Sequence, residues 1–257
     1  MMYNNVKHKL ENGGKALGTF YELGGSGAVE SLAIGGLDFF IIDTEHGPAD
    51  VESARDAVLA AGNHSITPFV RVKDTSRPSI LKMLDIGAKG LIVPCVETVE
   101  QVEKLVSYAK YYPVGRRGFA PVRASAWGFA DFAASAESLF AISNQETLLI
   151  PQCETASCLE HIDEIAGMIG VDGIFVGPYD LSVALGKPAQ MNNPALLAAI
   201  DHILKTCHKY NKIAMIFAAD AKTAKKFFQQ GFDCVACSMD AILLIDAVKR
   251  MTLEAME

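Results

Sequence analysis

The sequence predicts an α/β protein built as a single (β/α)8 barrel. Eight short apolar runs recur along the 257 residues, and most of them are apolar almost throughout. Parallel strands that are covered on both faces have this composition. Stretches of helical length separate the runs, and repeated βα units with short connections are typical of the barrel. No linker, low-complexity segment or tandem repeat marks a boundary, so residues 1–257 are expected to form one domain.

The expected strands follow one another in chain order, and charged or polar residues stand at the ends of several of them. They are ALGTFYE (16–22), FFIIDTE (39–45), TPFVRV (67–72), GLIVPCV (90–96), LLIPQCE (148–154), GIFVGP (173–178), KIAMIFA (212–218) and CVACSM (234–239).

Helices are expected between these strands, and several of them close on glycine, as helices commonly do. They are VESARDAVLAAG (51–62), SRPSILKMLDIGAKG (76–90), TVEQVEKLVSYAKYY (98–112), CLEHIDEIAGMIG (158–170), PALLAAIDHILKTCHKY (194–210) and AKTAKKFFQQG (221–231).

One connection departs from this rhythm. Residues 112–147, in the unit that follows the fourth strand, are rich in Gly, Arg and aromatic residues and predict a long loop insertion. Loops of this length are usually functional. Its arginines, Arg116, Arg117 and Arg123, are expected to fix the loop or an interface, and one of them could instead reach a distal carboxylate of a substrate.

Composition and charge narrow the class of function. The formal net charge is −7 and no long run of Lys or Arg occurs, so the chain lacks the electrostatic footprint of a protein that binds nucleic acid or an anionic membrane. No apolar run reaches the length of a bilayer span, and the N-terminus lacks the pattern of a secretory signal. We therefore expect a cytoplasmic protein whose partner is a small molecule.

Ionisable and polar residues cluster where the expected strands end. In this fold the βα loops meet at the C-terminal ends of the strands, and chemistry gathers there. Buried charges at such positions need mutual pairing or a bound ion, because an isolated buried charge is very costly. The residues are Asp43, Glu45 and His46 after the second strand, Arg71 after the third, Gln152 and Glu154 after the fifth, and Asp180 after the sixth.

Two carboxylates in this set suit a metal ion. Glu154 and Asp180 lie one βα unit apart, and two hard oxygen ligands with room for water and substrate suit Mg²⁺ or Mn²⁺. The alternative for Asp180, in FVGPYDLS (175–182), is a helix cap. The same helix start offers the N–H groups of Tyr179, Asp180 and Leu181 to a carboxylate.

Several ordered segments resemble one family. IIDTEHGPAD (41–50), FVRV (69–72), LDIGAKGLIVPCVET (84–98), YPVGRRG (112–118) with RAS (123–125), and the segment from PQCET to FVGPYDLSVALG (151–186) are similar to the HpcH/HpaI family of class II pyruvate aldolases. That family includes 4-hydroxy-2-oxoheptanedioate and 2-dehydro-3-deoxyglucarate aldolases. The resemblance covers nearly the whole chain and implies a barrel of the phosphoenolpyruvate/pyruvate-binding type.

The resemblance also implies a metal and substrate site. Glu154 and Asp180 are expected to bind the divalent metal, Mg²⁺ or Mn²⁺ with Co²⁺ as a further option. The supporting shell would be Gln152, Asp43 and Glu45, with Gln152 also contacting substrate. The backbone after Gly177 is expected to hold the substrate carboxylate, in the segment Gly177, Pro178, Tyr179 and Asp180.

The catalytic residues implied by the resemblance are Arg71, His46 and Asp85. Arg71 should face the pyruvate keto oxygen, and His46 with Asp85 should form the acid/base pair. Imidazole titrates near neutral pH, which suits a general base. Asp85 precedes the fourth strand, at the wrong end of its own barrel, so either the loop curves back or the residue acts across a subunit interface.

The function implied is reversible cleavage of a 4-hydroxy-2-oxo acid to pyruvate and an aldehyde through a metal-stabilised pyruvate enolate. The metal and Arg71 would stabilise the developing negative charge electrostatically. Two alternatives stay open: an acyl-CoA-type carbon–carbon lyase, like malyl-CoA or citryl-CoA lyase, and a non-catalytic oxo-acid-binding protein on the same scaffold. A basic CoA-binding cluster is not evident in the sequence.

The resemblance further implies a homo-oligomer, a hexamer built as a trimer of dimers with the last helix exchanged between subunits. The tail MDAILLIDAVKRMTLEAME (239–257) is compatible with that exchange. Two departures affect the substrate. Tyr179 replaces a usually small residue, and Phe20 with Tyr21 replaces a segment that commonly contains Trp, so the family's substrate preference is not carried over.

Overall fold

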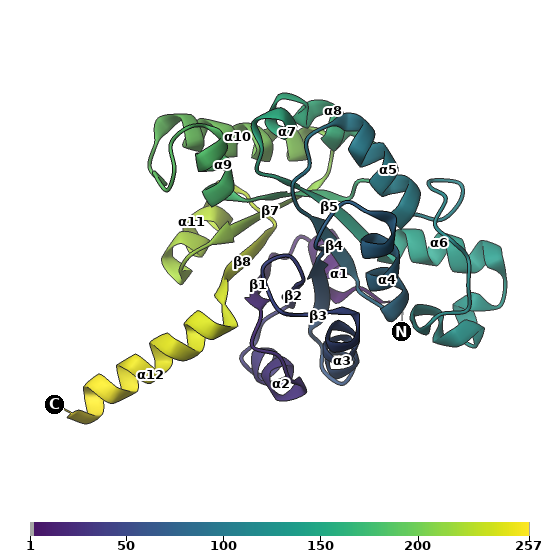
Figure 1. The fold of residues 1–257 in the computed structure, drawn as a ribbon, viewed down its shortest axis with the longest axis horizontal. Helices are drawn as coiled ribbons and strands as arrows, with labels where there is room; N and C mark the ends of the chain where they lie inside the picture. The colour runs from purple at the N-terminus through teal and green to yellow at the C-terminus, as the bar shows by residue number, and fades with distance from the viewer. Residues whose placement is uncertain (1–2, 257) are drawn as a thin grey trace.

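Eight parallel strands close into a barrel in the computed structural model, which describes residues 3–256. Each strand pairs with its neighbours in sequence, and β8 pairs with β1 (Figure 1). The predicted (β/α)8 barrel is therefore confirmed. The strands are β1 Ala16–Tyr21, β2 Phe39–Asp43, β3 Thr67–Arg71, β4 Gly90–Val93, β5 Leu148–Cys153, β6 Gly173–Val176, β7 Ile213–Ala218 and β8 Cys234–Met239.

Most strands end earlier than the sequence predicted. β4 ends at Val93 rather than at residue 96, and β2 ends at Asp43 rather than at residue 45. Pro94 has no N–H to donate to the ladder after β4. After β2, the side chain of Asp43 accepts the N–H of Glu45 at 3.0 Å, which turns the chain out of the sheet.

Helices surround the barrel. α3 and α5 begin with capping boxes, in which Asp50 pairs with Ser53 and Thr98 with Gln101. The predicted helix over 158–170 is two short helices that meet at His161. The helices are α1 Asn5–Glu11, α2 Ser26–Ile34, α3 Val51–Ala61, α4 Arg77–Ile86, α5 Val99–Ala109, α6 Ala136–Glu146, α7 Ala156–Glu160, α8 Ile162–Gly167, α9 Pro178–Ala184, α10 Pro194–Lys209, α11 Ala221–Gln230 and α12 Asp240–Met256.

The segment 112–147 is more ordered than the loop insertion predicted from sequence. It contains two 3-10 helices, η1 Arg123–Gly128 and η2 Asp131–Ala133, and then α6. It joins α5 to β5, and a connection from helix to strand lies at the N-terminal ends of the strands. The segment therefore lies at the opposite end of its own barrel from the βα loops.

The core has two layers, and strand alternation separates them. Phe39 and Ile41 fill the barrel interior, whereas Phe40 and Ile42 pack against the surrounding helices. Successive side chains of a strand point to opposite faces. The next inward position on β2 is Asp43, so the inward set continues from the apolar core into polar residues at the C-terminal ends of the strands.

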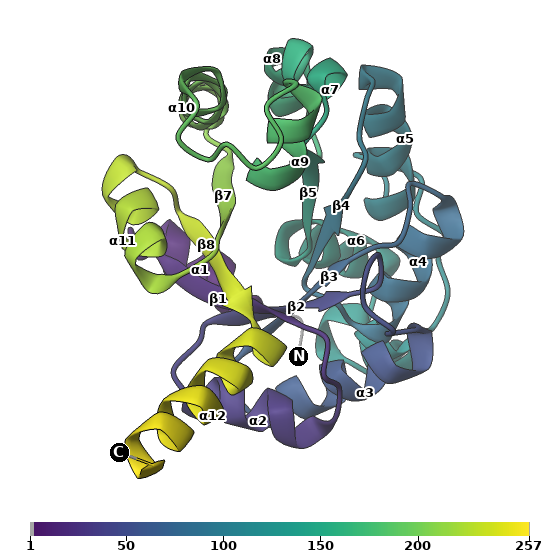
Figure 2. The same cartoon turned by 60° about the vertical axis from the view of Figure 1, so that its left-hand side comes forward.

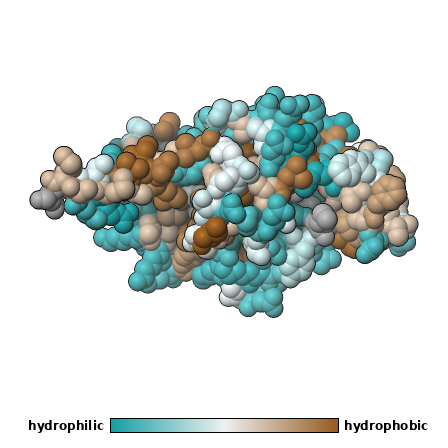
Figure 3. Space-filling model, turned by 90° about the horizontal axis from the view of Figure 1, so that it is seen from below, coloured by the Kyte–Doolittle hydropathy of each residue, from teal (hydrophilic) through white to brown (hydrophobic). Residues whose placement is uncertain are grey.

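The last helix, α12, extends away from the barrel (Figures 1 and 2). It contacts β1 and β8 at its start, where the carboxylate of Asp240 accepts the N–H groups of Glu22 and Leu23. Apolar side chains are exposed along its length, and Figure 3 shows them as brown surface. They are Ile242, Leu243, Leu244, Ile245, Val248, Met251, Leu253 and Met256.

Among the helices within residues 3–256, none is both long enough and apolar enough to cross a membrane.

Candidate active site

The candidate site is formed by the inward-facing side chains nearest the C-terminal ends of the strands. Asp43 follows Phe39 and Ile41 on β2, and Arg71 follows Phe69 on β3. The two residues are direct partners in the β2–β3 register. Because the two strands pair in parallel, the carboxylate of Asp43 and the guanidinium of Arg71 lie side by side at the C-terminal end of the barrel.

Arg71 is held by two acids and one aromatic ring. Its Nε donates to Asp43 Oδ1 at 3.0 Å, and its Nη2 to Asp43 Oδ2 at 2.5 Å. Nη1 lies 3.2 Å from Glu45 Oε2, and the guanidinium carbon is 4.8 Å from the centre of the Phe20 ring. Burial alone would lower the pKa of Arg71, but the hydrogen bonds and charge of Asp43 raise it overall. The guanidinium is therefore a fixed positive charge.

Asp43 positions Arg71 and the loop that follows β2. It is fully buried, and its Oδ1 also accepts the N–H groups of Glu45 at 3.0 Å and His46 at 3.3 Å. Burial raises its pKa, but hydrogen bonding to Arg71 and the charge of Arg71 outweigh burial, so the pKa lies below its usual range. The acid is ionised, and its oxygens are occupied by protein donors.

Glu154 lies directly after β5, with both carboxylate oxygens bonded. Oε1 accepts the N–H of Cys95 at 2.7 Å, and Oε2 accepts the side-chain amide of Gln152. Burial raises the pKa of Glu154, and the two hydrogen bonds lower it. The negative charges of Asp180 and Glu45 add to the effect of burial, so the pKa lies above its usual value. Three acids thus share a small region and would be stabilised by a cation.

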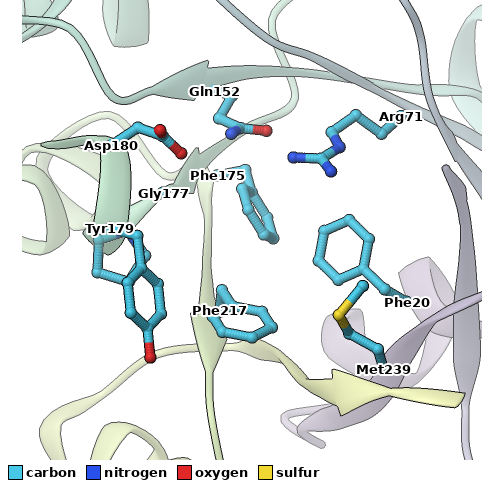
Figure 4. Close-up of a pocket in the computed structure, with 10 residues that line it drawn as sticks. Phe20, Arg71, Gln152, Phe175, Gly177, Tyr179, Asp180, Phe217 and Met239 are labelled. Atoms are coloured by element: carbon cyan, nitrogen blue, oxygen red, sulfur yellow. The ribbon is translucent and has the colours of Figure 1, made fainter. Parts of the chain in front are cut away.

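Gly177 is needed where it stands beside this carboxylate. A Cβ at Gly177 would lie 2.9 Å from Glu154 Oε2 and 3.0 Å from Gln152 Nε2. Any larger residue would push these groups apart. The side-chain oxygen of Gln152 is buried and has no hydrogen-bond partner within the described residues; it lies on the Arg71 side of the amide in Figure 4, and its lone pairs are free to bind a cation or a substrate group.

Asp180 occupies the first turn of α9, but its side chain does not cap that helix. It is exposed and lines the pocket together with Gln152 and Arg71 (Figure 4). This geometry disfavours the helix-cap alternative. Because α9 begins at Pro178, the N–H of Leu181 already donates to Gly177 O at 2.9 Å. Of the three N–H groups expected to face a substrate carboxylate, this one is therefore used inside the helix.

His46 and Asp85 do not meet within one chain. His46 is largely exposed in the loop after β2, and its Nε2 lies 4.0 Å from Glu45 Oε2. Asp85 lies near the end of α4, where its Oδ1 accepts from Arg117 Nη2 at 2.7 Å. The first alternative for Asp85, a loop that curves back, is therefore excluded, because α4 continues to Ile86 and holds the residue at the N-terminal end of the barrel.

The pocket also contains residues that the sequence did not single out. Phe217 on β7 and Met239 on β8 line it opposite Arg71 (Figure 4). Their positions near C-terminal strand ends were the available signal. Glu22, just after β1, lies beside Asp43; burial raises its pKa, and the charges of Asp43 and Asp240 raise it further.

The donor set fits a hard divalent cation. Within residues 3–256 no group of three or more His, Cys, Asp or Glu side chains forms a metal site. Glu154, Asp180 and the unpartnered oxygen of Gln152 are all oxygen donors, and Mg²⁺ commonly takes one or two carboxylates and completes its shell with water and substrate. Such a partial set is what a substrate-chelating ion requires.

Comparison with known proteins identifies the family. Residues 17–247 match the model of the HpcH/HpaI aldolase/citrate lyase family. The chain belongs to this family. It is 32% identical to a 2-keto-3-deoxy-L-rhamnonate aldolase of Klebsiella pneumoniae, with 97% of this chain and 92% of that protein covered. It is 35% identical to a hydroxypyruvate/pyruvate aldolase of Roseobacter denitrificans, with 96% and 94% covered.

The fold of a solved family member agrees with this assignment. The HpcH/HpaI aldolase from Desulfitobacterium hafniense has a TM-score of 0.92 to this chain and 27% identity, with 100% of this chain and 98% of that chain covered. The HpcH/HpaI resemblance predicted from the ordered motifs is confirmed over nearly the full length of the chain.

Proposed function

We propose that this member of the HpcH/HpaI family is a divalent-metal-dependent aldolase that reversibly cleaves a 4-hydroxy-2-oxo acid to pyruvate and an aldehyde. The observation that carries the proposal is the buried Arg71, which Asp43 fixes and which lines one pocket with Gln152 and Asp180; Glu154 is bonded to Gln152, and its charge acts on Arg71. Relatives named as a 2-keto-3-deoxy-L-rhamnonate aldolase and a hydroxypyruvate/pyruvate aldolase support it.

Glu154 and Asp180 would hold the cation, Mg²⁺, Mn²⁺ or Co²⁺, with Gln152 beside them. When bound, the cation supplies Lewis-acid charge at the substrate's C2 oxygen. Gly177 keeps Glu154 and Gln152 together, and the backbone of the Pro178–Asp180 turn is the candidate contact for the substrate carboxylate.

Arg71 provides positive charge at the position where the pyruvate fragment becomes negative. Its three contacts with Asp43 and Glu45 hold the guanidinium before substrate arrives. Such preorganisation stabilises the transition state without a reorganisation cost during reaction. Phe20, against one face of the guanidinium, reduces its access to water.

His46 is the proposed base that removes the proton from the C4 hydroxyl and returns it in the reverse direction. Its exposure in one chain leaves room for a second subunit to cover it. We propose that Asp85 reaches His46 from a neighbouring subunit, because Asp85 lies at the opposite end of its own barrel. A carboxylate beside the ring would fix its tautomer and raise its basicity.

The proposed assembly is a homo-oligomer, a trimer of dimers that exchanges α12. The supporting observation is that α12 extends from the barrel with a long apolar surface exposed. A monomeric protein rarely exposes a contiguous apolar patch of this kind. Covering α12 with another subunit would bury it.

The test is turnover by the purified protein. We expect it to release pyruvate from a 4-hydroxy-2-oxo acid with Mg²⁺ or Mn²⁺, to lose that activity with a chelator, and to regain it on metal addition. Activity that survives complete metal removal would refute metal dependence. Cleavage of malyl-CoA or citryl-CoA but not of free oxo acids would favour the thioester lyase, and binding without turnover would favour an oxo-acid-binding protein.

A further inference from the structure

The active-site pocket has two chemically different sides. Arg71, Gln152 and Asp180 lie along one side, and Phe20, Tyr179, Phe217 and Met239 lie along the other (Figure 4). If the proposed function holds, the polar side takes the 2-oxo acid. The other side then faces the substituent at C4 of the substrate, which leaves as the aldehyde. We call the second group of residues the aromatic wall.

The three rings of the aromatic wall and the neighbouring ring of Phe175 pack against one another in a continuous surface. Phe20 packs edge-on against Phe175 at 6.2 Å and against Phe217 at 5.9 Å between ring centres. Tyr179 packs against Phe217 at 5.9 Å. These separations are those of favourable aromatic pairs. The rings come from β1, β6, β7 and α9, so the closed barrel holds the surface in place.

The four residues of the aromatic wall carry no charged group, and the hydroxyl of Tyr179 is the only hydrogen-bond donor among their side chains. Arg71 and Asp180 are the charged residues among those lining the pocket, and both lie on the polar side. Within their own chain, Arg117 and Arg123 are bonded to Asp85 and to the carbonyl of Ile86 at the other end of the barrel, so they do not line this chain's pocket. The hydroxyl of Tyr179 points away from Gln152 and Arg71 in Figure 4.

We infer that the aromatic wall selects an aldehyde whose substituent is uncharged and apolar, either a short aliphatic chain or a single aromatic ring. The whole pocket has a volume of about 160 Å³ and has to hold the 2-oxo acid as well as this substituent, so the substituent must be small. A carboxylate placed against these rings would lose water without gaining a charged partner from them, and several hydroxyls would find at most one, the hydroxyl of Tyr179; this loss raises the energy of the bound state.

The experiment compares condensation of pyruvate with four aldehydes on the Mn²⁺-loaded enzyme: butanal, benzaldehyde, glyceraldehyde and 4-oxobutanoate. We expect kcat/KM for the two apolar aldehydes to exceed that for the two polar ones by about tenfold or more, the scale on which pockets discriminate substituents. In a binding measurement that needs no turnover, 2-oxo-4-phenylbutanoate should bind at least about tenfold tighter than 2-oxoglutarate.

Variants connect this preference to the wall. Phe217→Ser and Tyr179→Ser should each reduce the apolar-to-polar ratio, whereas Tyr179→Phe should keep it, because the ring and not the hydroxyl carries the selection. Ile169→Ser changes an exposed apolar residue at the other end of the barrel and should leave the ratio unchanged. Because two different wall residues are replaced by serine, the test stays valid if one of these variants fails to fold.

A separate measurement distinguishes failure of this inference from failure of the proposed function. The enzyme with Mn²⁺ should exchange the methyl protons of pyruvate for deuterium in D₂O, which reports proton removal without any aldehyde. Exchange together with an equal or greater preference for glyceraldehyde or 4-oxobutanoate would overturn the aromatic-wall inference alone. Absence of exchange and of condensation would overturn both.

Discussion

Arg71 gains its role from a fixed geometry and not from charge alone. The planar guanidinium makes two parallel bonds to Asp43 and a third contact to Glu45. A lysine ammonium is a point charge on a flexible stem and cannot reproduce this fork. The sequence predicted the identity of Arg71 and its place after a strand. The fork could not be predicted, because it depends on the β2–β3 register.

Replacing Arg71 tests this geometry. We expect Arg71→Lys to lower kcat by about 10²- to 10³-fold, the range for loss of one preorganised donor, with little change in fold by circular dichroism. Lysine still neutralises the charge of Asp43, so any loss of activity reports the lost orientation of the guanidinium and not an unpaired buried carboxylate. Arg55→Lys, in an exposed arginine on α3, is the matched control and should retain full activity. A kcat for Arg71→Lys within twofold of the parent would remove Arg71 from the site.

Gly177 provides a second test at residue scale. The added methyl of Gly177→Ala would meet Glu154 Oε2 and Gln152 Nε2 at 2.9 and 3.0 Å and displace them. We expect the affinity for Mn²⁺, measured by titration calorimetry, to fall by about 10- to 100-fold, as when groups that orient a ligand are disturbed. Gly27→Ala, where a Cβ meets nothing within 4 Å, should bind Mn²⁺ normally. Equal affinities in the two variants would argue against Glu154 as a ligand.

The barrel strands could be predicted from sequence because each is a short apolar run between turn signals. Their ends could not, because the polar residues that close β2 and β5 look the same in sequence whether they extend the ladder or turn away. The segment 112–147 shows the same limit. Its Arg-rich composition indicated function, but only the chain path through α5 shows that it lies at the N-terminal ends of the strands.

Lys89, the residue just before β4, offers a test at the scale of the secondary-structure elements. Burial lowers its pKa from 10.5 to about 8. Between these values the unfolded chain binds a proton that the folded chain does not, so this group's contribution to stability rises as pH increases from 8 to 10.5. The size of that rise is up to about 3 kcal/mol.

The measurement is the free energy of unfolding by urea for the parent and for Lys89→Met across this pH range. The parent should gain stability relative to the variant as pH rises, because effects of the buried cysteines are common to both proteins. Lys104→Met, on α5, is the control and should follow the parent. A difference between parent and Lys89→Met that stays constant with pH would show that Lys89 keeps its usual pKa in the folded protein.

At the scale of the whole molecule, α12 is the feature that a single chain leaves unexplained. Its exposed apolar residues would cost little to change in a monomer, because surface substitutions usually alter stability by less than about 0.5 kcal/mol. In an oligomer that buries them, added charges would be expensive. We expect the double variant Ile245→Glu with Val248→Glu to lower the molar mass measured by sedimentation. Lys249→Glu on the same helix should not, and an unchanged mass in the double variant would exclude α12 from the interface.

The proposed contact of Asp85 with a neighbour's His46 connects assembly to catalysis, and it allows a complementation test. Asp85→Asn and Arg71→Lys homo-oligomers should each have low activity. If Asp85 acts across subunits, some sites in a mixed oligomer contain both native residues, one from each chain, so co-refolded mixtures should regain a substantial fraction of activity. The recovery should disappear in the α12 double variant, which we expect not to assemble. If Asp85 acts only through its ion pair with Arg117 in its own chain, each site carries one defect or the other, and mixing will restore nothing.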